Sequence, residues 1–319
     1  MSSHSTPRPT PRNPLAEQIL TGLDAVFGYH PGHRAVHAKG AMCQGTFVPT
    51  SAATALTRAP HFSLPSTPVL ARFSDFAGIP SIPDNDPQGA GPRGMAVRFQ
   101  LGEHVHTDII AHSHDGFPVH TGEEFLEFVQ ALAASGPEAS KPTPIEKFLA
   151  SHPAGLRFAN TPKPIPTSFA REAYFGVSAI KFTNRENAVR FGRYRLLPTE
   201  GTSYLTDAEA SNQSADFLMQ ELAERLARGS VQYRLTVQLA EAGDNVDDAT
   251  SHWSDTREEV VLGTLTLKER LDDQQPDLRK IIFDPIPRVE GLEPTNDPLW
   301  NLRADIYLLS GRRRRAASQ

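Results

Sequence analysis

The stretch Arg34-Ala-Val-His-Ala-Lys-Gly40, continued by Ala41-Met-Cys-Gln-Gly-Thr-Phe47, is the part of the sequence around which the rest of the chain is interpreted. Most of its side chains are apolar or small, and Gly40 and Gly45 allow another backbone or a ligand to approach closely. His37 is a polar exception. Because histidine titrates near neutral pH, His37 can move protons under physiological conditions. A structural role would also fit a lone histidine beside apolar residues, so at this point His37 is a candidate catalytic residue.

Composition and charge describe a globular protein. The chain has 319 residues, of which 39% are hydrophobic, and it can bury a large core. The net charge of −5 gives no reason to expect nucleic acid or an anionic membrane as a partner, and no stretch reaches the roughly 20 apolar residues of a membrane span. The single cysteine, Cys43, excludes an internal disulfide and suits a reducing compartment. Residues 1–13 lack the apolar core of a secretory signal, so we expect a disordered tail and a cytoplasmic protein.

The apolar pattern beyond this tail predicts strands and helices in turn. The expected helices cover residues 14–27, 123–133, 206–228 and 297–309; the expected strands cover residues 68–74, 94–100, 106–111, 174–183, 189–198, 231–239 and 260–267; a proline-rich connector covers residues 134–169. Strands dominate and helices are inserted and appended, so we expect an α+β protein with a barrel or a large sheet decorated by helices. No repeat or linker divides the chain, which predicts one domain over residues 14–315 and a tail at 316–319.

A second polar pair stands near the end of the sequence, in Asp297-Pro-Leu-Trp-Asn-Leu-Arg-Ala-Asp-Ile-Tyr307. Arg303 and Tyr307 are four positions apart, so on a helix they share a face. A guanidinium within about 4–6 Å favours the phenolate form of a tyrosine, which is an anionic oxygen ligand suited to ferric iron. The spacing also allows an ordinary surface pair.

Several motifs, taken in order along the chain, resemble the haem catalase family, and specifically the short catalase-related peroxidases. They are Arg34-Ala-Val-His-Ala-Lys-Gly40, Gly45-Thr-Phe47, Ala71-Arg-Phe-Ser74, Pro92-Arg-Gly-Met-Ala-Val97, Thr107-Asp-Ile-Ile110, Ser168-Phe-Ala170, Phe175-Gly-Val177 with Lys181-Phe182, Arg193-Tyr194, Phe283-Asp-Pro285 and Asp297-Pro-Leu299 before Arg303-x-x-x-Tyr307. The resemblance covers roughly residues 30–314 and implies a catalase-like antiparallel β-barrel of about eight strands in a single haem-binding domain.

The resemblance also implies roles for individual residues. His37 resembles the distal histidine that takes a proton from hydrogen peroxide and returns it to the leaving oxygen. Ser74 resembles the residue that hydrogen-bonds the other imidazole nitrogen and so fixes the ring. Tyr307 resembles the axial ligand of the haem iron, a ligation that is a property of the family. Arg303 would hold this tyrosine as a phenolate.

Further residues match positions that contact haem in the family. They are Arg34, Val36, Arg72, Phe125 and Arg314. The guanidinium groups suit bidentate pairing with haem propionates, whereas Val36 and Phe125 would pack on the haem face. Residues 312–315 are all arginine, so a neighbour of Arg314 could take its place.

Two departures from the family pattern bear on activity. Catalases place an asparagine beside the distal histidine, but the segment Asp108-Ile-Ile-Ala-His-Ser-His-Asp115 has none. His112 and His114 are candidate replacements, and neither is equivalent to an asparagine. The chain also stops soon after Tyr307, without the C-terminal domain of classical catalases, so we expect a more open haem edge and a homodimer.

We therefore expect a haem b (iron protoporphyrin IX) peroxidase of the oxidative stress response. It would reduce hydrogen peroxide or organic hydroperoxides with organic electron donors and retain weak catalase activity. One alternative is a non-haem metal barrel, because His104-Val-His106 and His112-Ser-His114 place histidine pairs on strand faces. A haem-binding carrier without turnover and a hydroperoxide isomerase on the same fold are further alternatives.

Overall fold

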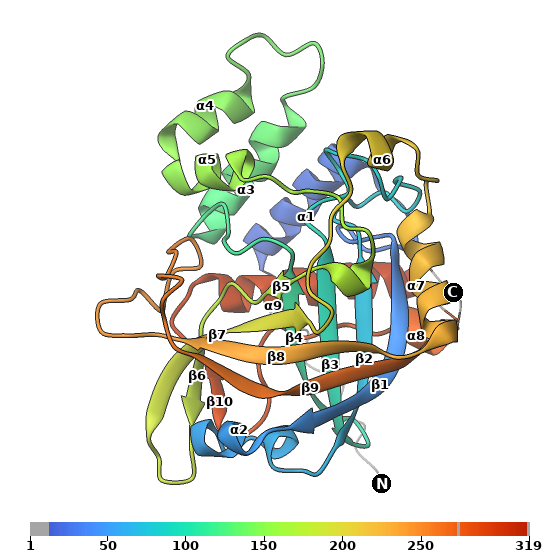
Figure 1. The fold of residues 1–319 in the computed structure, drawn as a ribbon. Coiled ribbons are helices and arrows are strands. Elements are labelled where there is room, and N and C mark those ends of the chain that lie inside the picture. The colour runs from blue at the N-terminus through green and yellow to red at the C-terminus, as the bar shows by residue number, and fades with distance from the viewer. Residues whose placement is uncertain (1–12, 273–274, 318–319) are drawn as a thin grey trace, which may run out of the picture.

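The computed structural model describes residues 13–272 and 275–317, which form a closed antiparallel β-barrel with helices around it (Figure 1). The strands are β1 (Gly40–Pro49), β2 (Thr67–Ser74), β3 (Gly94–Gly102), β4 (Val105–His112), β5 (Tyr174–Phe175), β6 (Ile180–Thr183), β7 (Val189–Pro198), β8 (Val231–Leu239), β9 (Glu259–Arg270) and β10 (Leu292–Pro294). Eight of them run in the order β7-β5-β4-β3-β2-β1-β9-β8, and pairing of β7 with β8 closes the barrel. The expected antiparallel barrel of about eight strands is therefore confirmed.

The helices lie outside this barrel (Figure 1). They are α1 (Pro14–Phe27), α2 (Ser51–Leu56), α3 (Gly122–Ala133), α4 (Pro144–Ser151), α5 (Pro153–Asn160), α6 (Asp207–Ser211), α7 (Phe217–Arg228), α8 (Pro276–Arg279) and α9 (Leu299–Ala316). The apolar faces of α1, α3 and α9 pack together in a core of their own. None of the described helices is long and apolar enough to cross a membrane.

The first helix follows directly from its sequence. The side chain of Asn13 accepts a hydrogen bond from the backbone N–H of Ala16, and Pro14 occupies the first turn, where its missing N–H costs nothing. Gly28 ends the helix with a φ of 83°, which glycine adopts without strain. We expected Asn13 to belong to the disordered tail, and this was wrong. Its side-chain amide also donates a hydrogen bond to the Asp305 carboxylate of α9 at 2.7 Å. The remainder of that tail, residues 1–12, lies outside the described residues.

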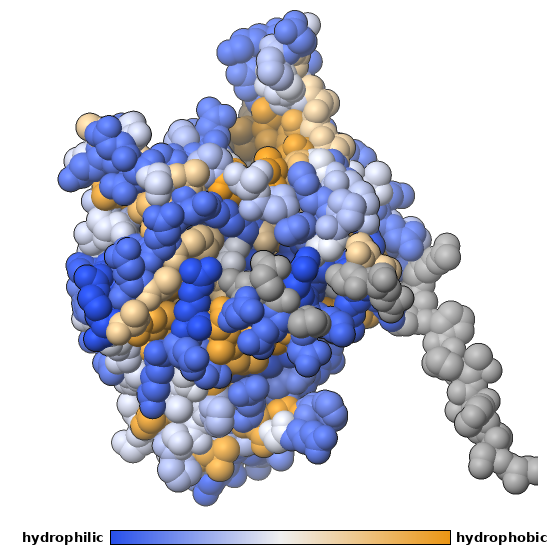
Figure 2. Space-filling model, turned by 90° about the vertical axis from the view of Figure 1, so that its right-hand side faces the viewer, coloured by the Kyte–Doolittle hydropathy of each residue, from blue (hydrophilic) through white to orange (hydrophobic). Residues whose placement is uncertain are grey.

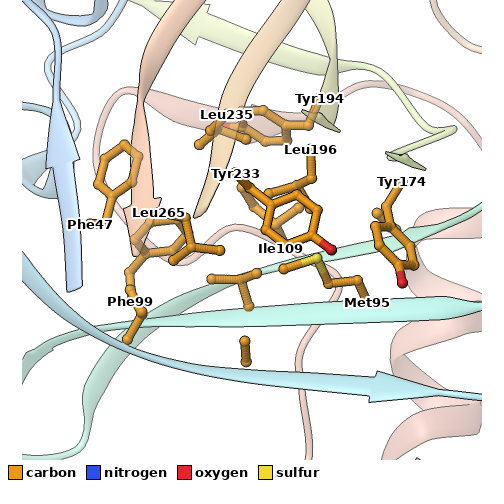
Figure 3. Close-up of a cluster of buried hydrophobic side chains, with 14 of the residues drawn as sticks. Phe47, Met95, Phe99, Ile109, Tyr174, Tyr194, Leu196, Tyr233, Leu235 and Leu265 are labelled. Carbon is orange, nitrogen blue, oxygen red and sulfur yellow. The ribbon is translucent and has the colours of Figure 1, made fainter. Parts of the chain in front are cut away.

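Large apolar side chains fill the inside of the barrel. Side chains alternate across a strand, so every second residue of each strand points inward. Figure 3 shows side chains from different strands meeting there, among them Phe99 of β3, Tyr194 of β7 and Leu265 of β9. Burial of each large side chain contributes about 1.5–3 kcal/mol to folding. Since the interior is occupied by protein, a ligand site is to be sought on the outer face.

The predicted connector over residues 134–169 was wrong in part, because it contains α4 and α5. Pro144 and Pro153 stand at the first positions of these helices, where proline is favoured, and Thr143 caps α4 through a capping box with Glu146. Together with α3 they form a lobe that projects from the barrel (Figure 1). The prolines here start helices rather than prevent them.

Other boundaries differ from the prediction as well. The strand expected over 174–183 is split into β5 and β6, and the helix expected over 206–228 is split into α6 and α7. The last helix continues to Ala316 rather than ending at residue 309. Arginines fill its last turn, where cations interact favourably with the helix dipole.

Candidate active site

A cavity of about 710 Å³, measured to its open mouth, lies between the outer face of the barrel and α9. The segment 34–37 and outward residues of β2, β3 and β4 form one part of its wall, and α9 with residues 281–283 forms another. Its apolar lining includes Val36, Ala96, Ile110, Ile282, Phe283 and Ile306. Its polar lining includes Arg34, His37, Arg72, Ser74, Tyr307 and Arg314. The cavity thus brings together residues from both ends of the sequence.

The register of the sheet leaves room for this cavity. Ser74 of β2 pairs with Gly94 of β3, and Gly94 pairs with His112 of β4. A Cβ atom at Gly94 would lie 2.7 Å from the Ser74 hydroxyl oxygen and 2.8 Å from the His37 Nδ1 atom. Only glycine therefore allows the imidazole to rest against β3 at this point. The motif that contains Gly94 could be identified from the sequence, but this role of the glycine could not.

His37 lies just before β1 with a backbone φ of 57°. This left-handed conformation is unfavourable for a residue with a Cβ atom, and such strain gathers at functional sites. Two backbone hydrogen bonds hold the segment in place: the His37 N–H donates to the Phe76 carbonyl at 2.7 Å, and the Ala38 N–H donates to the Ala77 carbonyl at 3.1 Å. These two hydrogen bonds offset the backbone strain at His37 and fix the position from which its imidazole extends.

The imidazole ring is oriented by its Nδ1 atom. This atom lies 3.0 Å from the backbone carbonyl oxygen of Asp75 and 3.1 Å from the Ser74 hydroxyl oxygen. A carbonyl oxygen can only accept, so the bond to Asp75 requires the proton on Nδ1 and leaves a lone pair on Nε2. The ring of Phe76 meets the imidazole edge-on at 5.7 Å between centroids. Ser74 therefore contacts the imidazole as expected, and the Asp75 carbonyl is a partner that the sequence analysis missed.

Burial and the positive charge of Arg72 together lower the pKa of His37 to about 4. The hydrogen bond to the Asp75 backbone acts in the opposite direction and is outweighed. The ring is consequently neutral at physiological pH. A neutral imidazole with a free Nε2 lone pair can accept a proton from a molecule in the cavity.

A buried ion-pair network lies behind Asp75. The Asp75 carboxylate pairs with Arg93, whose other terminal nitrogen donates to the Asp84 backbone carbonyl. The Asp84 carboxylate pairs with Lys39 at 2.6 Å and accepts the backbone N–H of Leu218 at 2.7 Å. This network ties the segment that carries His37 to the start of α7.

Tyr307 lines the cavity from α9, and Arg303 shares its helix face as predicted. The guanidinium carbon of Arg303 lies 5.9 Å from the centroid of the Tyr307 ring. In the part of the chain that the structure describes, no hydrogen bond joins the two side chains; Arg303 donates instead to the Ser178 hydroxyl at 3.4 Å. Arg303 is thus a neighbour of Tyr307 outside the cavity lining.

Burial distinguishes the four consecutive arginines from one another. Arg314 is buried and lines the cavity. Arg313 pairs with Asp24 of α1, while Arg312 and Arg315 are exposed. Arg314 stands two helical turns after Tyr307 and so shares its face of α9.

Backbone carbonyls hold the three cavity arginines. Nη2 of Arg314 donates to the Ile281 carbonyl at 2.8 Å, and Nη2 of Arg34 donates to the same carbonyl at 3.3 Å. Nη2 of Arg72 donates to the Ala38 carbonyl at 3.2 Å. These hydrogen bonds fix the three guanidinium groups in the lining of the cavity.

Of the two residues expected on a haem face, the cavity contains one. Val36 lines it, whereas Phe125 does not. Phe125 packs between Phe117 and Phe128, with ring centroids at 5.8 and 6.4 Å, inside the helical core. Phe125 is therefore a structural residue of the lobe.

The structure distinguishes His112 from His114. Residues paired directly across an antiparallel ladder project to the same face, so His112 projects on the side on which Gly94 meets His37. Both ring nitrogens of His112 are buried and have no hydrogen-bond partner among the described residues. His114 instead contacts the Gly116 carbonyl at 3.2 Å and the Phe158 ring at 4.5 Å. His112 is the histidine beside His37.

The other histidine pair lies away from the cavity. His104 stands in the exposed turn between β3 and β4, 3.8 Å from Glu103, and His106 lies 4.0 Å from Asp108. Across residues 13–272 and 275–317, no group of three or more His, Cys, Asp or Glu side chains could hold a metal ion. The non-haem alternative finds no ligand set there.

Comparison with known proteins identifies the family. The sequence model described as Catalase matches residues 31–318. The chain belongs to the catalase family. Among its catalase-family relatives, the catalase-related peroxidase of Synechococcus elongatus is 35% identical over 301 residues, covering 92% of this chain and 87% of the relative. The catalase-related peroxidase of Mycolicibacterium paratuberculosis is 33% identical over 297 residues, covering 92% and 93%.

Solved catalases share the fold. A fungal catalase superposes with a TM-score of 0.78 at 21% identity, covering 90% of this chain, and catalase A of Saccharomyces cerevisiae superposes with a TM-score of 0.77. The chain spans 60% and 61% of the lengths of these two solved catalases. Membership of the catalase family makes the protein an oxidoreductase of the catalase and peroxidase class, and it implies a haem cofactor.

Proposed function

We propose that the protein is a haem b peroxidase that reduces hydrogen peroxide, or an organic hydroperoxide, with an organic electron donor. The observation that carries this proposal is the single cavity lined by His37, Ser74, Tyr307 and three arginines. These residues are distant in the sequence, and they are the ones that the family pattern assigns to a haem site.

The cavity suits a haem in size and in chemistry. Its volume of about 710 Å³ falls within the range of about 300–1,000 Å³ usual for small-molecule sites. Apolar side chains and the small residues Gly94 and Ala96 offer a surface for a porphyrin. Arg34, Arg72 and Arg314 would pair with the two propionates. Tyr307 would be the axial iron ligand, with Arg303 nearby as a fixed positive charge.

When bound, haem supplies the iron at which the oxygen–oxygen bond of a peroxide is cleaved. His37 supplies the proton transfer. Its Nε2 atom accepts a proton from one oxygen of hydrogen peroxide and returns it to the other, which leaves as water. Ser74 and the Asp75 carbonyl keep Nδ1 protonated throughout, so the ring holds the tautomer that this transfer needs.

The balance of the reaction requires a donor. One hydrogen peroxide takes up two electrons and two protons and leaves as two waters, so two donor molecules each lose one electron. We infer that His112 takes the place of the distal asparagine. A neutral imidazole offers one N–H in place of the two of an amide, so a second peroxide is oriented less well. Donor oxidation then exceeds dismutation, and the catalase activity is weak.

The test is donor oxidation by the haem-loaded protein, with guaiacol as donor and either hydrogen peroxide or cumene hydroperoxide as oxidant. We expect His37→Ala to lower the rate by about 10²–10⁴, the usual contribution of a general acid–base group, while haem binding is retained. Unchanged turnover in His37→Ala would contradict the proposal. Haem binding without any turnover in the unmodified protein would favour the carrier.

We further propose a cytoplasmic homodimer that acts in oxidative stress, with neither nucleic acid nor membrane as partner. The net charge of −5 supports the absence of nucleic-acid and membrane partners, and the buried Cys43, which forms no disulfide, suits a reducing compartment. Light scattering of the purified protein measures its assembly, and a monomer would contradict the dimer.

A further inference from the structure

A second, larger cavity opens beside the first. It measures about 1,240 Å³ to its mouth and shares three arginines with the first cavity. We call its cationic lining the arginine vestibule, defined by Arg34, Arg72, Arg270, Arg279 and Arg314. Figure 2 faces the side of the molecule that carries α7 and α8, where strongly hydrophilic side chains surround apolar ones near the middle. Among the described residues that line this cavity there is no Asp or Glu.

Lys39 also lines the cavity, but its charge is compensated. Its ammonium group lies 2.6 Å from the Asp84 carboxylate and 2.7 Å from the Asp216 carboxylate. Arg279 differs, because within residues 13–272 and 275–317 no carboxylate pairs with it, and its guanidinium donates to the Gly32 carbonyl at 3.5 Å. Lys39 is therefore a structural cation, whereas Arg279 presents its charge to the vestibule.

The pKa values of His33 and Arg314 indicate a positive electrostatic potential in the vestibule. Burial lowers the pKa of His33 at the rim, and so does the positive charge of Arg279. Burial, together with the charges of Arg315 and Arg279, lowers the pKa of Arg314 to about 10. The guanidinium groups are thus close enough to repel one another.

The charge exceeds what a haem needs. A haem carries two propionates, and the proposed function already assigns them Arg34, Arg72 and Arg314. Arg279 adds a further guanidinium group to the same lining. A cleft lined by one sign of charge concentrates ligands of the opposite sign and raises their association rates by about 10–10³.

We propose that the arginine vestibule is the docking site of the electron donor, and that this donor is a small organic anion carrying a carboxylate or sulfonate group. This inference rests on the proposed function and deepens it by naming the donor class. Each anion held there would give up one electron and leave as its oxidised radical, and two such donors supply the two electrons that reduce one peroxide to water. Hydrogen peroxide reaches His37 through the other cavity, so the two substrates do not compete.

The test uses Arg279→Gln in the haem-loaded protein. This substitution removes a charge but keeps the backbone carbonyl that accepts a 2.8 Å hydrogen bond from Arg314 Nε. Arg190→Gln is the matched control, because Arg190 is an exposed arginine of β7 paired with Glu258. Binding of naphthalene disulfonate, which is not a donor, is measured by titration calorimetry. We expect its Kd to rise about fivefold or more in Arg279→Gln and to stay unchanged in Arg190→Gln.

Kinetics with two donors provide the second measurement. ABTS carries two sulfonates, whereas guaiacol is neutral. The kcat/KM for ABTS divided by the kcat/KM for guaiacol therefore measures the preference for an anionic donor. We expect this ratio to fall about fivefold in Arg279→Gln, through KM, and to fall in the unmodified protein as salt rises from about 0.01 to about 0.15 M. If guaiacol is oxidised but the Kd and the ratio are both unchanged in Arg279→Gln, the vestibule is not the donor site. Absence of guaiacol oxidation would instead overturn the proposed function, and the donor site with it.

Discussion

The Nδ1 atom of His37 lies 3.0 Å from the backbone carbonyl oxygen of Asp75. A backbone carbonyl is a steady acceptor, because it cannot be protonated near neutral pH and cannot rotate away. The orientation of the imidazole is therefore determined by the backbone conformation of Asp75, the residue that follows β2.

The first prediction concerns pH. Burial and the charge of Arg72 lower the pKa of His37 to about 4, and the reaction needs the neutral ring. We expect kcat/KM for hydrogen peroxide to be flat from about pH 8 to pH 5 and to fall as the pH drops through about 4, tenfold for each further unit. Stopped-flow measurement of the peroxide reaction checks this profile. A midpoint near 6.5, the value of a free histidine, would show that the ring is not shielded.

The second prediction concerns the contact between Gly94 and His37. Gly94→Ala places a methyl group 2.8 Å from the His37 Nδ1 atom, so the ring must move. We expect the peroxide reaction to slow about tenfold or more, and the free energy of unfolding to fall by about 1–3 kcal/mol. Gly102→Ala in the same strand is the control, because the nearest atom there is 3.8 Å away. Equal rates in the two variants would mean that the ring does not depend on this contact.

The third prediction concerns the buried pair of Arg93 and Asp75. Arg93→Gln leaves the Asp75 carboxylate buried without its cation, which typically costs about 3–5 kcal/mol of unfolding free energy. Chemical denaturation measures the loss. Arg190→Gln breaks the exposed pair with Glu258, and we expect a change of about 0–1 kcal/mol there. Similar losses in both variants would argue against a stabilising role of the buried network.

The fourth prediction concerns Tyr307. Tyr307→Phe removes the oxygen that would bind iron and keeps the ring, so we expect the fold to persist and haem affinity to fall about tenfold or more. Haem titration followed by absorbance measures the affinity, and circular dichroism reports the fold. Tyr194→Phe is the control, because its hydroxyl is buried in the barrel core and has no hydrogen-bond partner among the described residues. Unchanged haem spectra in Tyr307→Phe would exclude this tyrosine as the ligand.

The fifth prediction concerns the residue beside His37. We proposed that His112 takes the place of the distal asparagine, so His112→Asn would supply the amide of the family pattern. We expect the ratio of oxygen release to guaiacol oxidation to rise about fivefold or more. An oxygen electrode and a donor assay on the same preparation give the ratio. His114→Asn should leave it unchanged, because His114 is turned toward Phe158. If this ratio rises in His114→Asn and not in His112→Asn, His114 rather than His112 takes the place of the asparagine.

Helices and strands with clear end residues or regular alternation were predicted correctly from short stretches of sequence. The helix over 14–27 and the strands over 189–198 and 231–239 have the predicted bounds, because Pro14 and Gly28 mark the helix ends and regular alternation marks the strands. The helices of the proline-rich connector were missed because prolines also mark loops. The capping box at Thr143 was the signal that could have revealed α4.

The candidate site was predictable as a set of residues rather than as a geometry. Family motifs pointed to His37, Ser74 and Tyr307, and the cavity contains all three. The choice between His112 and His114 depends on the register between β3 and β4, which counting along the sequence cannot provide. The position of Phe125 depends on how the lobe packs, and the positive φ of His37 has no sequence signal.

The walls of the cavity come from opposite ends of the chain, and this has a consequence for assembly. The backbone N–H of Ala35 donates to the Ser310 hydroxyl at 3.4 Å across 275 positions of sequence. Closing so long a loop costs chain entropy before any contact repays it, so such contacts form late in folding. A chain still being synthesised presents His37 long before Tyr307 exists. We therefore expect haem capture to follow completion of the fold, which makes the loaded cofactor a marker that the whole chain has been made and folded.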